Sequence, residues 1–117
     1  MDPLKTDGYD LEAIARQFGT PLFVFSGDAI RDRVHEFRAS FGAEWPRFEL
    51  MPSLKACPIL GIRALLSELD CGCDVFGPGE FEGALRANVP PSRISLNGSI
   101  KDEAIIRNAI TLGVRIV

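Results

Sequence analysis

Four residues whose side chains could do chemistry lie at or just after the ends of short apolar runs: Lys55, Asp74, Glu80 and Asn97. In parallel α/β sheets the carboxyl ends of the strands form the crevice in which these folds place their ligands. A lysine there is partly desolvated, and such an amine is suited to forming a Schiff base with an aldehyde cofactor or a carbonyl substrate. The residue types therefore indicate carbonyl chemistry at Lys55, while the spacing alone also allows a lysine that caps a strand and keeps its amine in water.

The other three residues have both a functional and a structural interpretation. Asp74 ends the second predicted strand, where a carboxylate could orient the Lys55 amine and bias its protonation, but an aspartate that caps a turn would look the same. Glu80 lies in the first turn of a predicted helix, so the helix dipole explains it as well as catalysis does. Asn97 precedes a glycine, and a turn accounts for that pair without any function.

Two other motifs do not indicate sites. The glycine-rich run 77–83 has its third glycine one position too late for a dinucleotide-binding motif, and Glu80 would place a negative charge beside the pyrophosphate. The three cysteines are Cys57, Cys71 and Cys73. They have no CxxC spacing, so we predict neither a disulfide framework nor a metal site, and the last two should pack in the core. His35, the only histidine, should be a solvated surface residue.

The N-terminal part of the chain predicts two helices and a strand. A short amphipathic helix should cover 10–18, with Asp10 as its N-cap and Gly19 as its stop. A buried strand should follow over 22–25 and a longer helix over 29–41. The apolar stripe of that helix, which should face the sheet, consists of Ile30, Val34, Phe37 and Phe41.

Strands and helices then alternate regularly. The predicted strands are 48–54, 73–76, 94–96 and 114–117, and the predicted helices are 59–69, 80–87 and 102–112. Regular alternation with short connections is typical of a parallel sheet wound with helices. The last strand should leave an unpaired edge that more chain or another molecule covers.

Three blocks of this α/β region carry a family resemblance. They are Pro52-Ser-Leu-Lys-Ala-Cys57, Gly72-Cys-Asp-Val-Phe-Gly-Pro-Gly-Glu80, and the run 90–101, which reads Pro-Pro-Ser-Arg-Ile-Ser-Leu-Asn-Gly-Ser-Ile-Lys. They are similar, in order and spacing, to segments of the fold-type III pyridoxal-phosphate decarboxylases, the alanine-racemase-like family of the diaminopimelate, ornithine and arginine decarboxylases. The diaminopimelate enzymes look most similar. Pro52 and Cys57 stand where the family has an aromatic residue and an asparagine.

The resemblance implies the N-terminal portion of a (β/α)8 TIM-like barrel. Such a barrel takes about 250 residues, so it is incomplete in a chain of 117 residues. Residues 1–28 would provide a helix and a strand that lead into the barrel, and residues 29–117 its first βα units.

The resemblance also implies a cofactor and roles for the four residues. Pyridoxal 5'-phosphate would bind there, with Lys55 forming the internal aldimine and Asp74 acting beside the lysine amine. Asp74, Glu80 and Asn97 would border the cofactor. The substrate would be a small amino acid of the diaminopimelate or ornithine type, and the full-length enzyme would be a homodimer.

The resemblance leaves other functions open. The family's phosphate loop, the acid that pairs with the pyridine nitrogen and the histidine on the ring come from later barrel strands, and no segment here matches them. We therefore expect this polypeptide alone to be inactive, and a decarboxylase only when downstream chain completes it. The alternatives are a non-catalytic pyridoxal-phosphate-binding or regulatory homologue and a small α/β interaction module.

Charge and hydropathy exclude two classes of partner. A net charge of −3 argues against nucleic acid, which needs a concentrated basic face. No apolar run approaches the ~20 residues that cross a bilayer, and the N-terminus lacks a signal-peptide core. We expect a cytoplasmic protein with no membrane partner.

Overall fold

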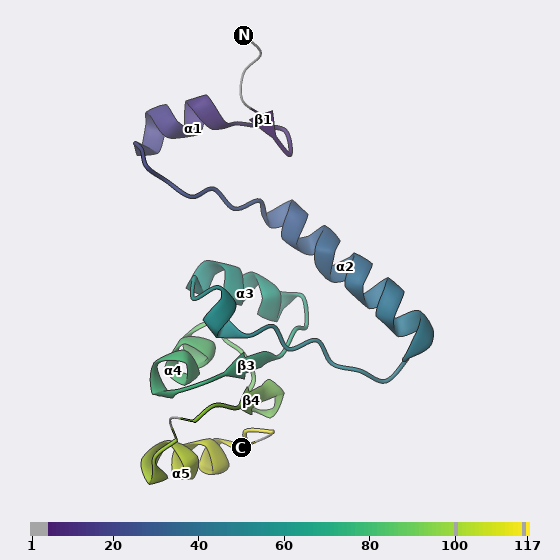
Figure 1. The fold of residues 1–117 in the computed structure, drawn as a ribbon, viewed down its shortest axis with the longest axis vertical. Coiled ribbons are helices and arrows are strands. Elements are labelled where there is room, and N and C mark those ends of the chain that lie inside the picture. Colours follow the sequence, from purple (N-terminus) through teal and green to yellow (C-terminus); the bar gives the residue numbers. More distant parts are fainter. Residues whose placement is uncertain (1–4, 100, 116) are drawn as a thin grey trace.

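The computed structural model describes residues 5–99, 101–115 and 117 (Figure 1). It begins with a small antiparallel hairpin of β1 (Lys5–Thr6) and β2 (Tyr9–Asp10), followed by α1 (Leu11–Phe18) and the long helix α2 (Gly27–Glu44). The remaining elements are the 3-10 turn η1 (Leu54–Ala56), α3 (Leu60–Glu68), β3 (Cys73–Val75), α4 (Pro78–Arg86), the 3-10 turn η2 (Pro91–Arg93), β4 (Ile94–Leu96) and α5 (Glu103–Leu112).

Helix α1 begins and ends as its sequence predicts. The Asp10 carboxylate accepts a hydrogen bond from the Ala13 backbone N–H at 3.0 Å, and Gly19 ends the helix with a φ of +83° that favours glycine. The predicted buried strand over 22–25 is wrong, because these residues form no strand and Phe23 is 92% exposed. A strand requires a neighbour for its backbone groups, and the described part of the chain offers none to this run.

Helix α2 is longer than predicted and buries less of its apolar stripe. The Ser26 hydroxyl caps the helix by accepting a hydrogen bond from the Ala29 N–H at 3.1 Å. Val34 is buried as predicted, but Phe37 and Phe41 remain 46% and 47% exposed. Figure 1 shows why: α2 lies to one side of the layered part of the molecule.

Three parallel segments form the sheet region: residues 50–53, β3 and β4. β3 and β4 pair in parallel, with Cys73, Asp74 and Val75 opposite Ile94, Ser95 and Leu96. Residues 50–53 run along the other edge of β3, where the Leu50 carbonyl accepts from Gly72 N–H at 2.9 Å and Ser53 forms a bridge with Asp74. Beyond β4, Arg115 N–H donates to the Ile94 carbonyl at 3.2 Å. The chain thus winds outward one βα unit at a time.

Two predicted strands are less regular than expected. The segment 48–54 forms only the single bridge at Ser53, because Pro52 has no N–H to donate to a ladder. The segment 114–117 is not assigned as a strand, and one of its residues, at position 116, lies outside the described part. The strand at 94–96 has the predicted bounds.

The core lies between the sheet and the helices on its outer face. Side chains alternate along each strand, so Cys73, Val75, Ile94 and Leu96 all point to one face, and each is at most 1% exposed. Phe81 and Ala84 of α4 and Ile105 and Ala109 of α5 complete this cluster. The opposite face carries the polar residues Ser53, Asp74 and Ser95, which makes it the face available for a site.

Candidate functional site

The polar face of the sheet is organised in layers that follow from strand register. Ser53, Asp74 and Ser95 lie side by side on three neighbouring strands. The next residues on the same side, two positions along each chain, are Lys55, Phe76 and Asn97. The register therefore places Asp74 and Asn97 on one face, and the contact of the Lys55 amine with the Phe76 ring at 4.1 Å brings Lys55 to the same region.

Lys55 lies on the turn η1 rather than on a strand. Two hydrogen bonds form this turn, from Ala56 N–H to the Ser53 carbonyl and from Cys57 N–H to the Leu54 carbonyl, both at 3.2 Å. The Leu54 side chain, 4% exposed, anchors the turn in the core. The neighbouring Lys55 side chain is exposed, whereas the sequence predicted partial desolvation.

The Lys55 amine contacts an aromatic ring that the sequence analysis did not single out. Its Nζ atom lies 4.1 Å from the centroid of the Phe76 ring. Such a contact is worth about 0.5–1 kcal/mol at an exposed site and restricts where the amine can lie. Phe76 could have been recognised from its position two residues beyond Asp74, on the same face. In the described part of the chain no ion pair joins Lys55 to the half-buried Asp74 carboxylate.

Glu80 shapes the loop between β3 and α4. Its Oε2 atom accepts a hydrogen bond from the Phe76 N–H at 2.9 Å. Glu80 also occupies the first turn of α4, where a carboxylate interacts favourably with the helix dipole. The structure therefore gives Glu80 a defined role in holding the backbone of Phe76.

Asn97 and Gly98, which follow β4, border the Phe76 ring. Asn97 N–H donates to the Val75 carbonyl at 2.8 Å, and its exposed side chain accepts from Gly98 N–H at 2.8 Å. Gly98 has a φ of +96°, and a Cβ there would lie 2.7 Å from the Phe76 ring and carbonyl. Only glycine lets the loop approach Phe76 so closely.

An ion cluster occupies the opposite, amino ends of the strands. Arg93 contacts Glu49 at 2.8 Å and Asp70 at 2.6 Å, and Arg115 pairs with Glu49, which is 17% exposed. In barrels of this architecture the amino-terminal face serves stability and the carboxyl-terminal face serves chemistry. These charges therefore belong to the scaffold.

The two buried cysteines also belong to the scaffold, as predicted. Cys71 and Cys73 are 1% and 0% exposed, and burial raises the pKa of both thiols above their ordinary value of 9.0, although nearby arginines, Arg38 for Cys71 and Arg63 for both, partly oppose this. His35 is exposed, which confirms its prediction as a surface residue.

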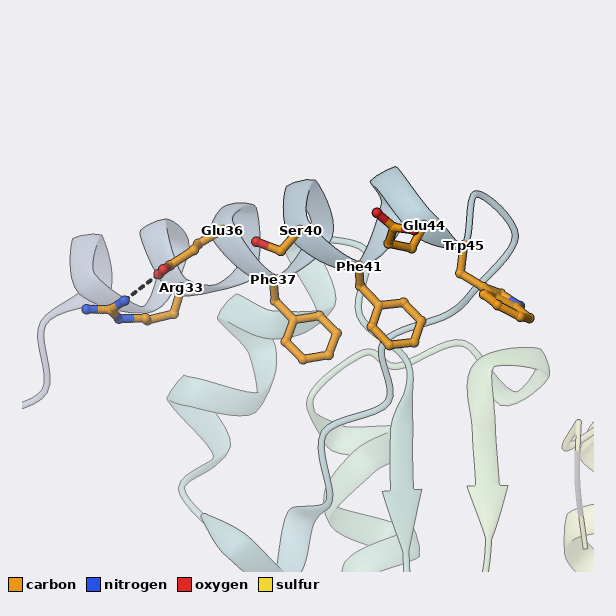
Figure 2. A pocket seen from close by; sticks show the side chains of 7 residues that line it. All are labelled: Arg33, Glu36, Phe37, Ser40, Phe41, Glu44 and Trp45. Carbon is orange, nitrogen blue, oxygen red and sulfur yellow. Dashed lines mark hydrogen bonds and ion pairs between the residues drawn. The ribbon is translucent and has the colours of Figure 1, made fainter.

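A separate apolar hollow lies on α2. Figure 2 shows Phe37 and Phe41 pointing the same way from the helix, and their rings stack at 5.6 Å. The hollow is lined by Arg33, Glu36, Phe37, Ser40, Phe41, Glu44 and Trp45. None of these is a predicted site residue, and none carries a primary amine that could form a Schiff base.

In the described residues, no helix is long and apolar enough to cross a membrane.

Comparison with known proteins identifies the family. Residues 27–117 match the family model for "Pyridoxal-dependent decarboxylase, pyridoxal binding domain". The chain therefore belongs to the pyridoxal-dependent decarboxylases. This confirms the resemblance seen in the sequence.

Individual relatives agree with this assignment. The diaminopimelate decarboxylase of Methanothermobacter thermautotrophicus is 33% identical over 113 residues, which cover 97% of this chain and 26% of the relative. The crystal structure of the M. jannaschii diaminopimelate decarboxylase with L-lysine has a TM-score of 0.87 and 34% identity, and covers 93% of this chain and 26% of that one. A lysine/ornithine decarboxylase from Vibrio vulnificus with cadaverine has a TM-score of 0.77 and 28% identity, and covers 88% and 27%.

The chain thus spans about a quarter of the length of these relatives. Its fold is the first part of an alanine-racemase-like barrel, as predicted. The described residues fit an aldehyde cofactor, because the Lys55 primary amine is exposed at the carboxyl ends of the strands and is held by a ring rather than neutralised by a carboxylate.

Proposed function

We propose that this chain provides the lysine-bearing first part of a pyridoxal-phosphate-dependent decarboxylase of small amino acids, with a diaminopimelate-type substrate as the first candidate. The observation that carries the proposal is the exposed Lys55 amine over Phe76, one layer above Asp74, in a chain of the pyridoxal-dependent decarboxylase family. Residues 1–28 would lead into the barrel, and 29–117 would form its first βα units.

Each residue has a task in this reaction. When bound, pyridoxal phosphate supplies an electron sink for the pair that is released as the substrate carboxylate leaves as carbon dioxide. The Lys55 Nζ atom would hold the cofactor carbonyl carbon and could afterwards deliver a proton to the product. The Asp74 carboxylate would orient that amine when the two approach. Phe76 would restrict the positions that the Lys55 side chain can take, and Asn97 would border the same site at the carboxyl ends of the strands.

Glu80 would act through Phe76 and not on the substrate. Its carboxylate already accepts the Phe76 N–H. We further propose that the complete enzyme works as a homodimer in the cytoplasm, which family resemblance supports.

A decarboxylation assay tests the proposed function. The complete enzyme, in which further βα units close the barrel that this chain begins, should release carbon dioxide from diaminopimelate when supplied with pyridoxal phosphate, and Lys55→Ala should abolish that release. Lys101→Ala is the matched control, since Lys101 is also an exposed lysine and should retain activity. If the folded protein binds the cofactor but releases carbon dioxide from neither diaminopimelate, ornithine, lysine nor arginine, it is a non-catalytic homologue and the proposal is wrong.

A further inference from the structure

A buried arginine lies behind the strands that carry the site. Arg63 occupies the middle of α3 and is only 2% exposed. In the described residues, no carboxylate lies within ion-pair distance of its guanidinium, and its Nε–H is buried without a hydrogen-bond partner. A buried charge left uncompensated in this way costs free energy, and replacing it with an apolar residue is often neutral or stabilising. Arg63 is therefore held by hydrogen bonds to the backbone and not by an ion pair among the described residues.

The contacts that Arg63 does make join the two strands of the site. Its Nη1 donates to the Pro52 carbonyl at 3.2 Å and its Nη2 donates to the Cys71 carbonyl at 3.4 Å. Pro52 lies three residues before Lys55, and Cys71 lies three residues before Asp74. One guanidinium thus binds the backbone three residues before Lys55 and three residues before Asp74.

At the junction that Arg63 crosses, the backbone hydrogen bond farther from the site is of ordinary length, since Gly72 N–H donates to the Leu50 carbonyl at 2.9 Å, and the bond nearer the site is longer. Between residues 50–53 and β3, the hydrogen bond from Asp74 N–H to the Pro52 carbonyl is 3.4 Å long, and Pro52 has no N–H to offer in return. The neighbouring junction is tighter, with β3 and β4 in register over three residues and Asn97 N–H bonded to the Val75 carbonyl at 2.8 Å. Arg63 thus adds two hydrogen bonds at the junction that has fewer backbone hydrogen bonds than the β3–β4 junction.

We propose that Arg63 is a positioning residue that fixes the relative height of Lys55 and Asp74 by binding the backbones of their two strands. The effect on catalysis rests on the proposed function. The pair of hydrogen bonds from Arg63 to the two backbones, here called the clamp, does not depend on it. Loss of the clamp should let the 50–53 segment slide or separate from β3, and Lys55 should then lose its defined position at the mouth.

Two measurements on Arg63→Met and Arg63→Lys test the clamp in the protein as encoded. The first is the rate at which Lys55 is modified by pyridoxal phosphate and borohydride, with Lys101 in the same molecule as the internal standard. In Arg63→Met the Lys55 rate should fall by roughly tenfold while Lys101 is unchanged, since misplacing a reacting group by about 1 Å can cost up to a hundredfold. Arg63→Lys should recover part of the rate, because an ammonium can reach one carbonyl but cannot span both.

The second measurement is amide hydrogen exchange, which needs no cofactor. The Asp74 amide should lose protection in Arg63→Met, while the Asn97 amide on the next strand should keep it. If Lys55 is not modified even in the wild-type protein, the proposed function fails, but this exchange result still decides the clamp. Unchanged protection at Asp74 would overturn it.

A matched control separates positioning from general destabilisation. Ile105→Ala removes core packing on α5 without removing a hydrogen bond of the junction, although Ile105 belongs to the same core cluster as Leu54 and Cys73. If it lowers the Lys55 rate as much as Arg63→Met does at equal loss of stability, Arg63 has no positioning role. Should neither Arg63 variant fold, the wild-type guanidinium decides: slowly exchanging, rotationally restricted Nη protons support the clamp, and free rotation contradicts it.

Discussion

At the scale of single residues, the site depends on how closely the loop that follows β4 approaches Phe76. Gly98 is the residue that permits this approach, both through its positive φ and through the missing side chain. Gly98→Ala should destabilise the protein by about 1–3 kcal/mol, because a non-glycine residue in this backbone region is strained and its Cβ would collide with the Phe76 carbonyl. Urea unfolding measures the change.

Gly79→Ala is the control for that substitution. A Cβ at Gly79 meets nothing within 4 Å and its φ is not positive. Within α4, alanine should stabilise by about 0.5–1 kcal/mol relative to glycine. Equal changes in the free energy of unfolding for the two substitutions would show that the close approach of Gly98 to Phe76 does not affect stability.

The buried thiols make stability depend on pH. Burial raises the pKa of Cys71 and Cys73 in the folded protein, so above the ordinary value of 9.0 the unfolded chain has lost protons that the folded chain still holds. The thiols' stabilisation is complete below that pH and is lost as pH rises through it towards the folded pKa. The urea midpoint should therefore fall as pH rises above 9.0, and Cys71→Ala with Cys73→Ala should flatten the decline. A decline of unchanged steepness in the double variant would contradict this account.

At the scale of elements, the sequence predicted the βα units well. The bounds of β4 and the Asp10 cap of α1 follow from local patterns, because capping and alternation are properties of neighbouring residues. Asp102, predicted as the first residue of its helix, is instead the N-cap of α5. Residues 48–54 fell short of a regular strand because Pro52 interrupts the ladder.

Part of the site could not be predicted from local patterns. Lys55, Asp74 and Asn97 were recognisable as polar residues at strand ends, but the ring over which the lysine lies depends on how residues 50–53 pair with β3, about twenty residues further along the chain. Arg63 was missed because arginine in a helix is normally solvent-exposed. Only tertiary structure shows that its side chain turns inward to the carbonyls of Pro52 and Cys71.

At the scale of the whole molecule, the structure is open. Its radius of gyration is 17.2 Å, whereas a compact domain of this length would measure about 13 Å. α2 stands beside the βα layers (Figure 1), and its aromatic face is only partly covered, by Phe48, whose ring lies 6.4 Å from that of Phe37 and 5.0 Å from that of Phe41. In a closed barrel the first and last strands pair, so the relatives' further βα units would come to this side.

The exposed aromatic face predicts self-association of the 117-residue polypeptide. Phe37 and Phe41 are about half exposed and Trp45 is 66% exposed, and contiguous apolar surface of this kind drives association. Phe41→Glu should shift the polypeptide towards monomer in sedimentation experiments. Phe18→Glu, at an exposed phenylalanine on α1, should leave association unchanged. A wild-type polypeptide that stays monomeric at every concentration would contradict this prediction.

The central claim is that Lys55 is the lysine that binds the cofactor, and mapping the modified lysine tests it most directly. Among residues 1–117 the lysines are Lys5, Lys55 and Lys101, and a peptide map distinguishes these three from one another. The protein as encoded is incubated with pyridoxal phosphate, reduced with borohydride and digested, and the pyridoxyl group is located by mass spectrometry. The account predicts modification at Lys55 at low cofactor concentration, and its loss in Lys55→Ala but not in Lys101→Ala. Modification spread equally over the three lysines, or retained in full by Lys55→Ala, would contradict it.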